Sequence, residues 1–88
     1  MYCILVYDVG EKRVTKMLKH FRQYLNWIQN SVFEGELTKG QIEEMIVGSK
    51  KIMKKEEDSI ILFSMQSNKY LEKKIYGVDK SDLTSNFI

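Results

Sequence analysis

The stretch Met1-Tyr2-Cys3-Ile4-Leu5-Val6-Tyr7-Asp8-Val9 decides the fold of this chain. From Tyr2 to Tyr7, six apolar or aromatic residues follow one another, and the carboxylate of Asp8 closes the run. A strand with one face in solvent alternates apolar and polar residues, so an unbroken run indicates a strand covered on both faces. A chain of 88 residues has little material to cover both faces by itself. The sequence therefore predicts a second subunit against this strand, with Asp8 close to it.

The composition is that of one small globular domain. The chain is 43% hydrophobic and 30% charged, a balance typical of folded rather than disordered proteins. We therefore expect residues 1–88 to form a single domain with a modest core, a size class in which oligomerisation often adds stability. The formal charge of +2 neither requires nor excludes nucleic acid. Lysines outnumber arginines twelve to two, so bidentate reading of bases is not the expected main activity.

Cysteine content and targeting signals narrow the class further. Cys3 is the single cysteine, which excludes an internal disulfide and a cysteine-rich zinc site. Its place inside the apolar run favours a buried structural thiol over a reactive one. The N-terminal run has no basic leader or small-residue cleavage site, and no stretch approaches the roughly 20 apolar residues of a membrane span. We therefore expect a cytoplasmic protein without a membrane partner.

Two amphipathic helices are predicted. The first covers residues 11–25, with one apolar stripe and a mostly basic opposite face. The stripe comprises Val14, Met17, Leu18, Phe21 and Leu25; the opposite face comprises Lys12, Lys16, Lys19, His20 and Gln23, with Arg13 at its margin. The second helix runs from Thr38 to about residue 54, because Thr38 and Gln41 have the spacing of a capping box. Gly48 in its interior either relieves crowding or marks a bend.

The remaining segments favour strands. Residues 27–37 are rich in aromatic and β-branched residues and form either one kinked strand or a tight pair of short strands. Residues 59–65 are apolar on consecutive positions, which indicates a second central strand. Short strands are expected at 74–78 and 84–88. The acidic run at 56–58 is assigned to a solvated turn.

This order of elements predicts a two-layer α+β sandwich with both helices on one face of the sheet. The other face of the two central strands is then left apolar. Face-to-face packing of two sheets in a symmetric homodimer would cover it.

Four motifs point to a known family. They are Tyr7-Asp8-Val9, Lys12-Arg13-Val14, the stretch Gln29-Asn30-Ser31-Val32-Phe33-Glu34-Gly35-Glu36-Leu37, and Glu57-Asp58-Ser59-Ile60. Together, in this order and spacing, they resemble CRISPR-associated protein 2, the small subunit of the CRISPR adaptation machinery. The resemblance covers nearly the whole chain.

The resemblance implies a ferredoxin-like fold with an antiparallel sheet, and a homodimer. The C-terminal segment, about residues 79–88, would pack on the partner subunit and give Phe87 and Ile88 their surface. The implied role is spacer acquisition, in which the dimer binds double-stranded DNA and bridges dimers of the integrase, CRISPR-associated protein 1. Members are also described as metal-dependent endonucleases, mostly on single-stranded RNA and sometimes on double-stranded DNA. The family's metal-binding aspartate corresponds to Asp8, so Mg²⁺ or another divalent cation is the expected cofactor.

The chain departs from the family pattern at two arginines. Many members carry two near the start of the first helix, whereas here only Arg13 remains, with Glu11 two residues before it. An arginine often stands two residues before the Gln-x-Ser-Val-Phe motif, whereas here that residue is Trp27. These losses weaken the case for RNA cleavage through arginines more than the case for a scaffold.

Asp8 has two interpretations. Alternation along a strand places it on the face of Ile4 and Val6, so a two-fold axis at that face would bring a second Asp8 close. Two facing carboxylates repel unless a cation or a shared proton lies between them, and Mg²⁺ is commonly held by one or two carboxylates and waters. In the alternative, Asp8 caps the first helix or ends the strand in solvent. One carboxylate per subunit is a sparse constellation for catalysis.

The sequence is therefore compatible with three functions. The first is an adaptor in spacer acquisition, and the second is a metal-dependent endonuclease with Asp8 as the catalytic metal ligand. The third is a non-catalytic ferredoxin-like RNA- or ligand-binding module, although the aromatic–basic pattern of an RNA-recognition motif is missing. Within the resemblance, the candidates for contacting phosphates are Lys12, Arg13, Lys16 and Lys19. His20, on the same face, is expected to be a surface histidine.

Overall fold

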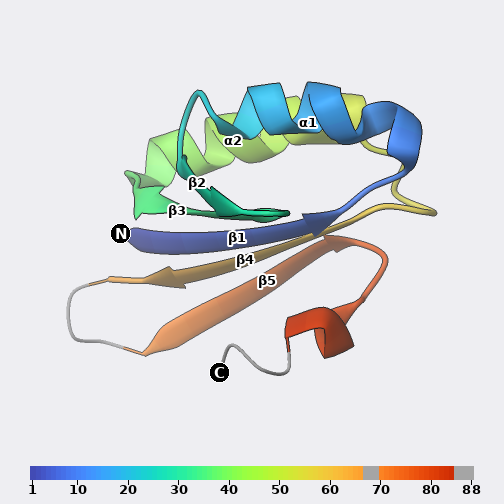
Figure 1. The fold of residues 1–88 in the computed structure, drawn as a ribbon. Coiled ribbons are helices and arrows are strands. Elements are labelled where there is room, and N and C mark those ends of the chain that lie inside the picture. The colour runs from blue at the N-terminus through green and yellow to red at the C-terminus, as the bar shows by residue number, and fades with distance from the viewer. Residues whose placement is uncertain (67–69, 85–88) are drawn as a thin grey trace.

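The computed structural model describes residues 1–66 and 70–84 of the chain. One layer is a five-stranded antiparallel sheet in the order β2-β3-β1-β4-β5, and two helices form the second layer on one face of it (Figure 1). The elements in chain order are β1 (Tyr2–Asp8), the 3-10 helix η1 (Glu11–Arg13), α1 (Val14–Phe21), β2 (Asn26–Gln29), β3 (Val32–Glu36), α2 (Lys39–Ile52), β4 (Ser59–Met65), β5 (Leu71–Gly77) and the 3-10 helix η2 (Ser81–Thr84). The predicted α+β sandwich is confirmed.

β1 is the middle strand of the sheet. It pairs antiparallel with β3 on one side and β4 on the other, so that Leu5 lies opposite both Phe33 and Leu62. Cys3, Leu5 and Tyr7 point toward the helices and are almost completely buried. On the opposite face Ile4 is half-buried and Val6 is buried, so that side chains on both faces of this strand are shielded, which accounts for its unbroken apolar run.

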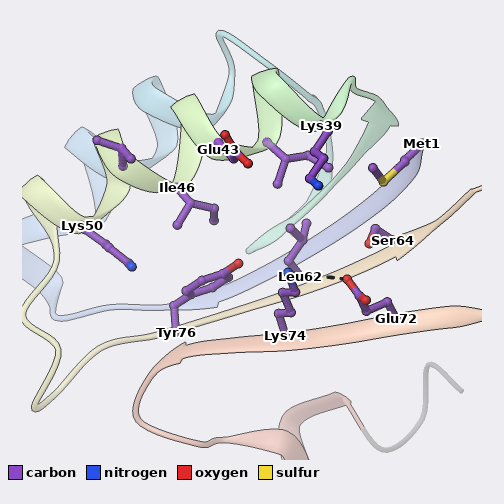
Figure 2. Close-up of a pocket in the computed structure, with 12 residues that line it drawn as sticks. Met1, Lys39, Glu43, Ile46, Lys50, Leu62, Ser64, Glu72, Lys74 and Tyr76 are labelled. Atoms are coloured by element: carbon purple, nitrogen blue, oxygen red, sulfur yellow. Dashed lines mark ion pairs between the residues drawn. The ribbon is translucent and has the colours of Figure 1, made fainter.

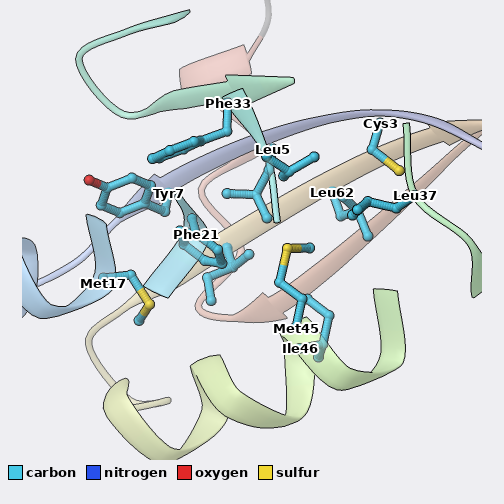
Figure 3. Packing of buried hydrophobic residues seen from close by; sticks show 12 residues of the cluster. Cys3, Leu5, Tyr7, Met17, Phe21, Phe33, Leu37, Met45, Ile46 and Leu62 are labelled. Atoms are coloured by element: carbon cyan, nitrogen blue, oxygen red, sulfur yellow. The ribbon is translucent and has the colours of Figure 1, made fainter. Parts of the chain in front are cut away.

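The core between the layers is built around three aromatic rings (Figure 3). Tyr7, Phe21 and Phe33 come from β1, α1 and β3, and their ring centroids lie 5.4 to 6.0 Å apart. Tilted rings at this separation attract one another beyond the effect of buried area. Met17 of α1 and Met45 of α2 are fully buried beside them. The rings therefore fix how α1 sits over the sheet.

The second helix begins as its sequence indicates. The Thr38 hydroxyl accepts a hydrogen bond from Gln41 N at 3.1 Å, and the Gln41 side chain accepts one from Thr38 N at 2.9 Å, which confirms the capping box. The first helix is shorter than predicted, because residues 11–13 form a 3-10 turn and the α-helix ends at Phe21. Leu25 still reaches the core from the turn that follows.

His20 is not the surface residue that its basic helix face suggests. Its Nε2 lies 2.7 Å from the carbonyl oxygen of Met45, and its ring packs against those of Phe21 and Tyr24. A Cβ at Gly48 would collide with the His20 ring. Gly48 therefore relieves crowding where the two helices meet, which decides between the two interpretations of this glycine.

The region after α1 is a tight pair of strands rather than one kinked strand. β2 and β3 pair antiparallel around Asn30, whose positive φ of 45° allows the sharp turn. The strand expected at 74–78 is longer and covers Leu71–Gly77. The strand expected at 84–88, with Phe87 and Ile88, falls on residues 85–88, which lie outside the described residues.

The sheet face away from the helices is already largely buried in the single chain. Val6, Ile61 and Phe63 point to this face, and all are 7% exposed or less in the single chain. The sequence predicts that a second subunit covers this face, and the dimer stays a prediction; in the single chain, η2 lies on this side of the sheet (Figure 1). One row of this face is nevertheless open. Tyr2, Met65 and Leu71 lie opposite one another across β1, β4 and β5, with 36 to 44% of their surface exposed.

Candidate functional site

Asp8 ends β1 at the surface, with a cation beside it. Half of its side chain is exposed, and its Oδ2 accepts a hydrogen bond from Lys80 Nζ at 2.9 Å. The same ammonium group donates to the backbone oxygen of Glu57 at 3.3 Å. Lys80 follows β5 and is 72 residues away in sequence, so only the folded chain brings it to Asp8. A cation that binds at Asp8 must first displace this ammonium group.

A second oxygen lies on the neighbouring strand. Ser59 is the cross-strand partner of Asp8 in the β1–β4 ladder and is 1% exposed. Its Oγ is buried and has no hydrogen-bond partner within the described part of the chain. A buried hydroxyl normally has a hydrogen-bond partner. A cation or a water molecule between Ser59 and the Asp8 carboxylate would supply the missing partner. Carboxylate and hydroxyl oxygens suit a hard cation. Residues 1–66 and 70–84 contain no group of three or more acidic, histidine or cysteine side chains that could hold a metal.

The acidic run at 56–58 is not a solvated turn, because Asp58 is completely buried. Its Oδ2 accepts hydrogen bonds from Arg13 Nε at 2.6 Å and from Lys54 N at 2.8 Å. Its Oδ1 accepts from Arg13 Nη2 and Gly10 N, both at 2.9 Å. Asp58 thereby joins the connection after β1, the end of α2 and the start of β4. The run of charged residues gave no signal of this, since the partners lie up to 48 residues away.

The hydrogen bonds in this cluster shift the pKa values of Asp58 and Arg13. The hydrogen bonds from Arg13, assisted by those from Lys54 N and Gly10 N, lower the pKa of Asp58 from 3.8 to about 2, against an opposing effect of burial. The pKa of Arg13 is raised by the same contact. Arg13 is 17% exposed and also contacts Glu57 at 3.0 Å. The guanidinium group of Arg13 therefore already has its partners within the chain. Through them, Arg13 holds the loop between Asp8 and α1 against the strand that carries Ser59.

The other candidates for phosphate binding differ from Arg13 in their surroundings. Lys12, Lys16 and Lys19 are exposed on η1 and α1, and none of them takes part in a salt bridge within the described residues. The structure therefore separates the four predicted residues into three exposed lysines and one structural arginine. Asp8 lies at the end of β1, from which η1 and α1 continue. Phe87 and Ile88 are outside the described residues.

Comparison with known proteins gives a consistent result. A family model described as CRISPR associated protein Cas2 matches residues 1–73. A curated relative from Methanosarcina acetivorans, "CRISPR-associated endoribonuclease Cas2", is 46% identical over 88 residues and covers 100% of both chains. A relative of the same name from Dictyoglomus turgidum is 46% identical over 81 residues, which are 92% of this chain and 93% of the relative.

Solved structures agree in fold. One titled "Crystal structure of cas2" is 43% identical, has a TM-score of 0.73, and covers 92% of this chain and 91% of that one. A crystal structure of Streptococcus pyogenes Cas2 is 27% identical, has a TM-score of 0.69, and covers 77% and 89%. Among the described residues, neither helix has the length and apolar character needed to cross a bilayer.

Proposed function

Because the chain belongs to the CRISPR associated protein Cas2 family, we propose that it serves CRISPR adaptation as a homodimer that binds double-stranded DNA and bridges dimers of the CRISPR-associated protein 1 integrase. The observation that carries the proposal is the pair of unlike surfaces on opposite sides of the sheet. One has an open apolar row, and the other has helices with exposed lysines.

The apolar row supports the dimer. Tyr2, Met65 and Leu71 are aligned on the sheet face opposite the helices, and a second copy related by two-fold symmetry presents the same row in return. Burying apolar surface drives such an association. Leu71→Glu should therefore give a monomer in light scattering. Val47→Glu, a matched change at an exposed apolar residue of α2, should leave the dimer intact. A wild-type monomer at micromolar concentration would refute the dimer.

The exposed lysines support the contact with DNA. Lys12, Lys16 and Lys19 follow one another along η1 and α1 at intervals of four and three residues, which places them on one side of the helix. Contacts from lysines to phosphates are independent of sequence and weaken with salt. Changing all three to glutamine should weaken binding to a DNA duplex and lower the slope of log K against log salt by about 3. An unchanged slope would remove this surface from the proposal.

The bridging role has its own experiment. A pull-down of the partner integrase with wild-type protein should succeed, and Asp8→Asn should leave it intact, because an adaptor does not need the carboxylate. Capture that fails with a correctly folded dimer would refute the bridge, whatever the outcome of the DNA experiment.

A second candidate function is a metal-dependent endonuclease, which the unpaired Ser59 hydroxyl beside Asp8 favours. Asp8, with Ser59 at its side, would hold Mg²⁺ or another divalent cation. A bound cation of this kind lowers the pKa of water and thereby supplies a nucleophile for phosphodiester hydrolysis. Within the chain, Lys80 balances the charge of Asp8 until a cation takes its place, and Arg13 and Asp58 hold the loop and strand that present the two oxygens.

Cleavage assays distinguish the two roles. Mg²⁺-dependent cleavage of single-stranded RNA or double-stranded DNA should be lost in Asp8→Asn and retained in Asp82→Asn, a change at an exposed aspartate of η2. Equal activity in the two variants would exclude Asp8 from catalysis. Absence of cleavage in the wild-type protein, together with intact capture of the integrase, would leave the adaptor as the sole function.

A further inference from the structure

A groove runs between α2 and β5, on the helix side of the sheet, where the two helices leave the edge strand uncovered (Figure 2). It consists of two hollows of about 410 and 620 Å³ that share Lys50 and Tyr76. Ile46 and Leu62 line the first hollow, and Met53 lines the second. We call it the α2–β5 groove. Each hollow falls within the range of volumes of small-molecule sites.

The rims of the groove are mostly basic. Among the residues that the structure describes, five lysines line it against three glutamates, and the lysines are Lys39, Lys50, Lys54, Lys55 and Lys74. One of the acids, Glu72, lies 3.6 Å from Lys74 and is thereby neutralised. The salt bridges of the described residues involve none of the other four lysines. The groove therefore attracts an anion with several charges spaced along its length.

An aromatic ring lies where the two hollows meet. Tyr76 projects from β5 toward α2, and Lys50 Nζ lies 5.4 Å from the centre of its ring (Figure 2). The lysine has a flexible stem and can move from the ring to a phosphate. A flat ring beside an ammonium group is the combination that contacts a nucleobase and its phosphate at once.

We propose that the α2–β5 groove binds single-stranded nucleic acid, with a base stacked on Tyr76 and phosphates along Lys50, Lys54 and Lys55. A duplex keeps its bases paired inside and would bring only phosphates to the groove, so Tyr76 would have no base to contact. An acidic peptide would match the lysines but would gain nothing specific from the ring. β5 is seven residues long, or about 23 Å, a length that suits about four nucleotides.

This site is distinct from the α1 lysines assigned to duplex DNA and from Asp8. It does not depend on the proposed adaptor role. The experiment measures fluorescence anisotropy of a labelled oligothymidylate of about eight nucleotides, and separately of a labelled duplex. Wild-type protein is compared with Tyr76→Leu, Tyr76→Phe and the triple change of Lys50, Lys54 and Lys55 to glutamine. The triple glutamine variant of the α1 lysines is the matched control.

Tyr76→Leu should weaken binding of the oligothymidylate about tenfold, because one stacked base is lost, while Tyr76→Phe should bind like the wild type. The groove lysine variant should lower the single-strand salt slope by about 2 and leave duplex binding unchanged. The α1 variant should show the reverse pattern. If Tyr76→Leu does not fold, the comparison of the two lysine variants alone decides the matter.

Three outcomes would overturn the proposal. One is equal loss of single-strand binding in the groove and α1 variants. Another is full affinity of a folded Tyr76→Leu. The third is displacement of the oligothymidylate by an oligoglutamate peptide at a lower concentration than by unlabelled oligothymidylate, which would assign the groove to an acidic protein segment. Loss of duplex binding alone would concern the adaptor proposal and not this one.

Discussion

Replacing Asp58 by asparagine should destabilise the fold more than any change at an exposed carboxylate. The side chain is fully buried and accepts four hydrogen bonds, two of them from Arg13. An asparagine has one acceptor oxygen instead of two, so one set of donors faces its amide group and Arg13 keeps a charge without its buried partner. Breaking a buried ion pair from one side costs about 3 kcal/mol or more, a large part of a total on the order of 10 kcal/mol for a domain of this size.

The effect should depend on pH, with a sign that follows from the pKa of Asp58. That pKa is about 2 in the folded chain and 3.8 as its ordinary value. Because the folded value is the lower one, ionised Asp58 contributes stability above pH 3.8, and this contribution is lost as the pH falls toward 2. The difference corresponds to about 2 kcal/mol. The stability gap between wild type and Asp58→Asn should therefore narrow by about that amount between pH 6 and pH 2.

Urea unfolding followed by circular dichroism, repeated across this pH range, measures both quantities. Glu57→Gln is the matched control, because Glu57 contacts the same guanidinium group but is 61% exposed. Its loss should change the free energy of unfolding by less than about 1 kcal/mol. Equal stability of the two variants, or a stability gap between wild type and Asp58→Asn that does not change with pH, would refute the role assigned to Asp58.

Three further predictions concern other parts of the molecule. Gly48→Ala should lower the free energy of unfolding by about 1 kcal/mol, because the new Cβ displaces the His20 ring. This loss outweighs the better helix propensity of alanine. In a His20→Ala background, the same change should instead stabilise the protein in thermal unfolding. Lys80→Gln should tighten Mg²⁺ binding severalfold in calorimetry, since it removes the cation that occupies Asp8, and an unaltered affinity would argue against a metal at this carboxylate. The Cys3 thiol, whose pKa is raised by burial, should react with a thiol reagent only at the rate of unfolding, and rapid modification of the folded protein would contradict its burial.

Local sequence patterns predicted much of the fold. The apolar runs of β1 and β4 and the capping box at Thr38 are local features, and each was found where the pattern placed it. The stripe on α1 was found in part, because Met17 and Phe21 are buried whereas Val14 is exposed. The motif set around Asp8 also indicated the family that the comparisons show. These successes share a cause, because periodicity and capping act between residues a few positions apart.

The errors share a cause as well. Asp58 stands in an acidic run and His20 on a basic helix face, so both looked solvated from their neighbours in sequence. Their environment is set by partners that the pattern does not reveal: Arg13 lies 45 residues from Asp58, and Met45 lies 25 residues from His20. Arg13 is likewise held by a distant partner, and a contact between Arg13 and phosphate stays a prediction.

The sequence by itself determined the layers, the central place of β1 and the presence of a carboxylate at its end, because apolar residues must be buried and their spacing shows which faces are. Only the tertiary structure decided what surrounds that carboxylate. Lys80 and Ser59 reach Asp8 through strand pairing and chain reversal, which join residues that are distant in sequence. The unpaired hydroxyl of Ser59 beside Asp8 makes this strand end a candidate site for a cation, and the ammonium group of Lys80 occupies the carboxylate until a cation displaces it.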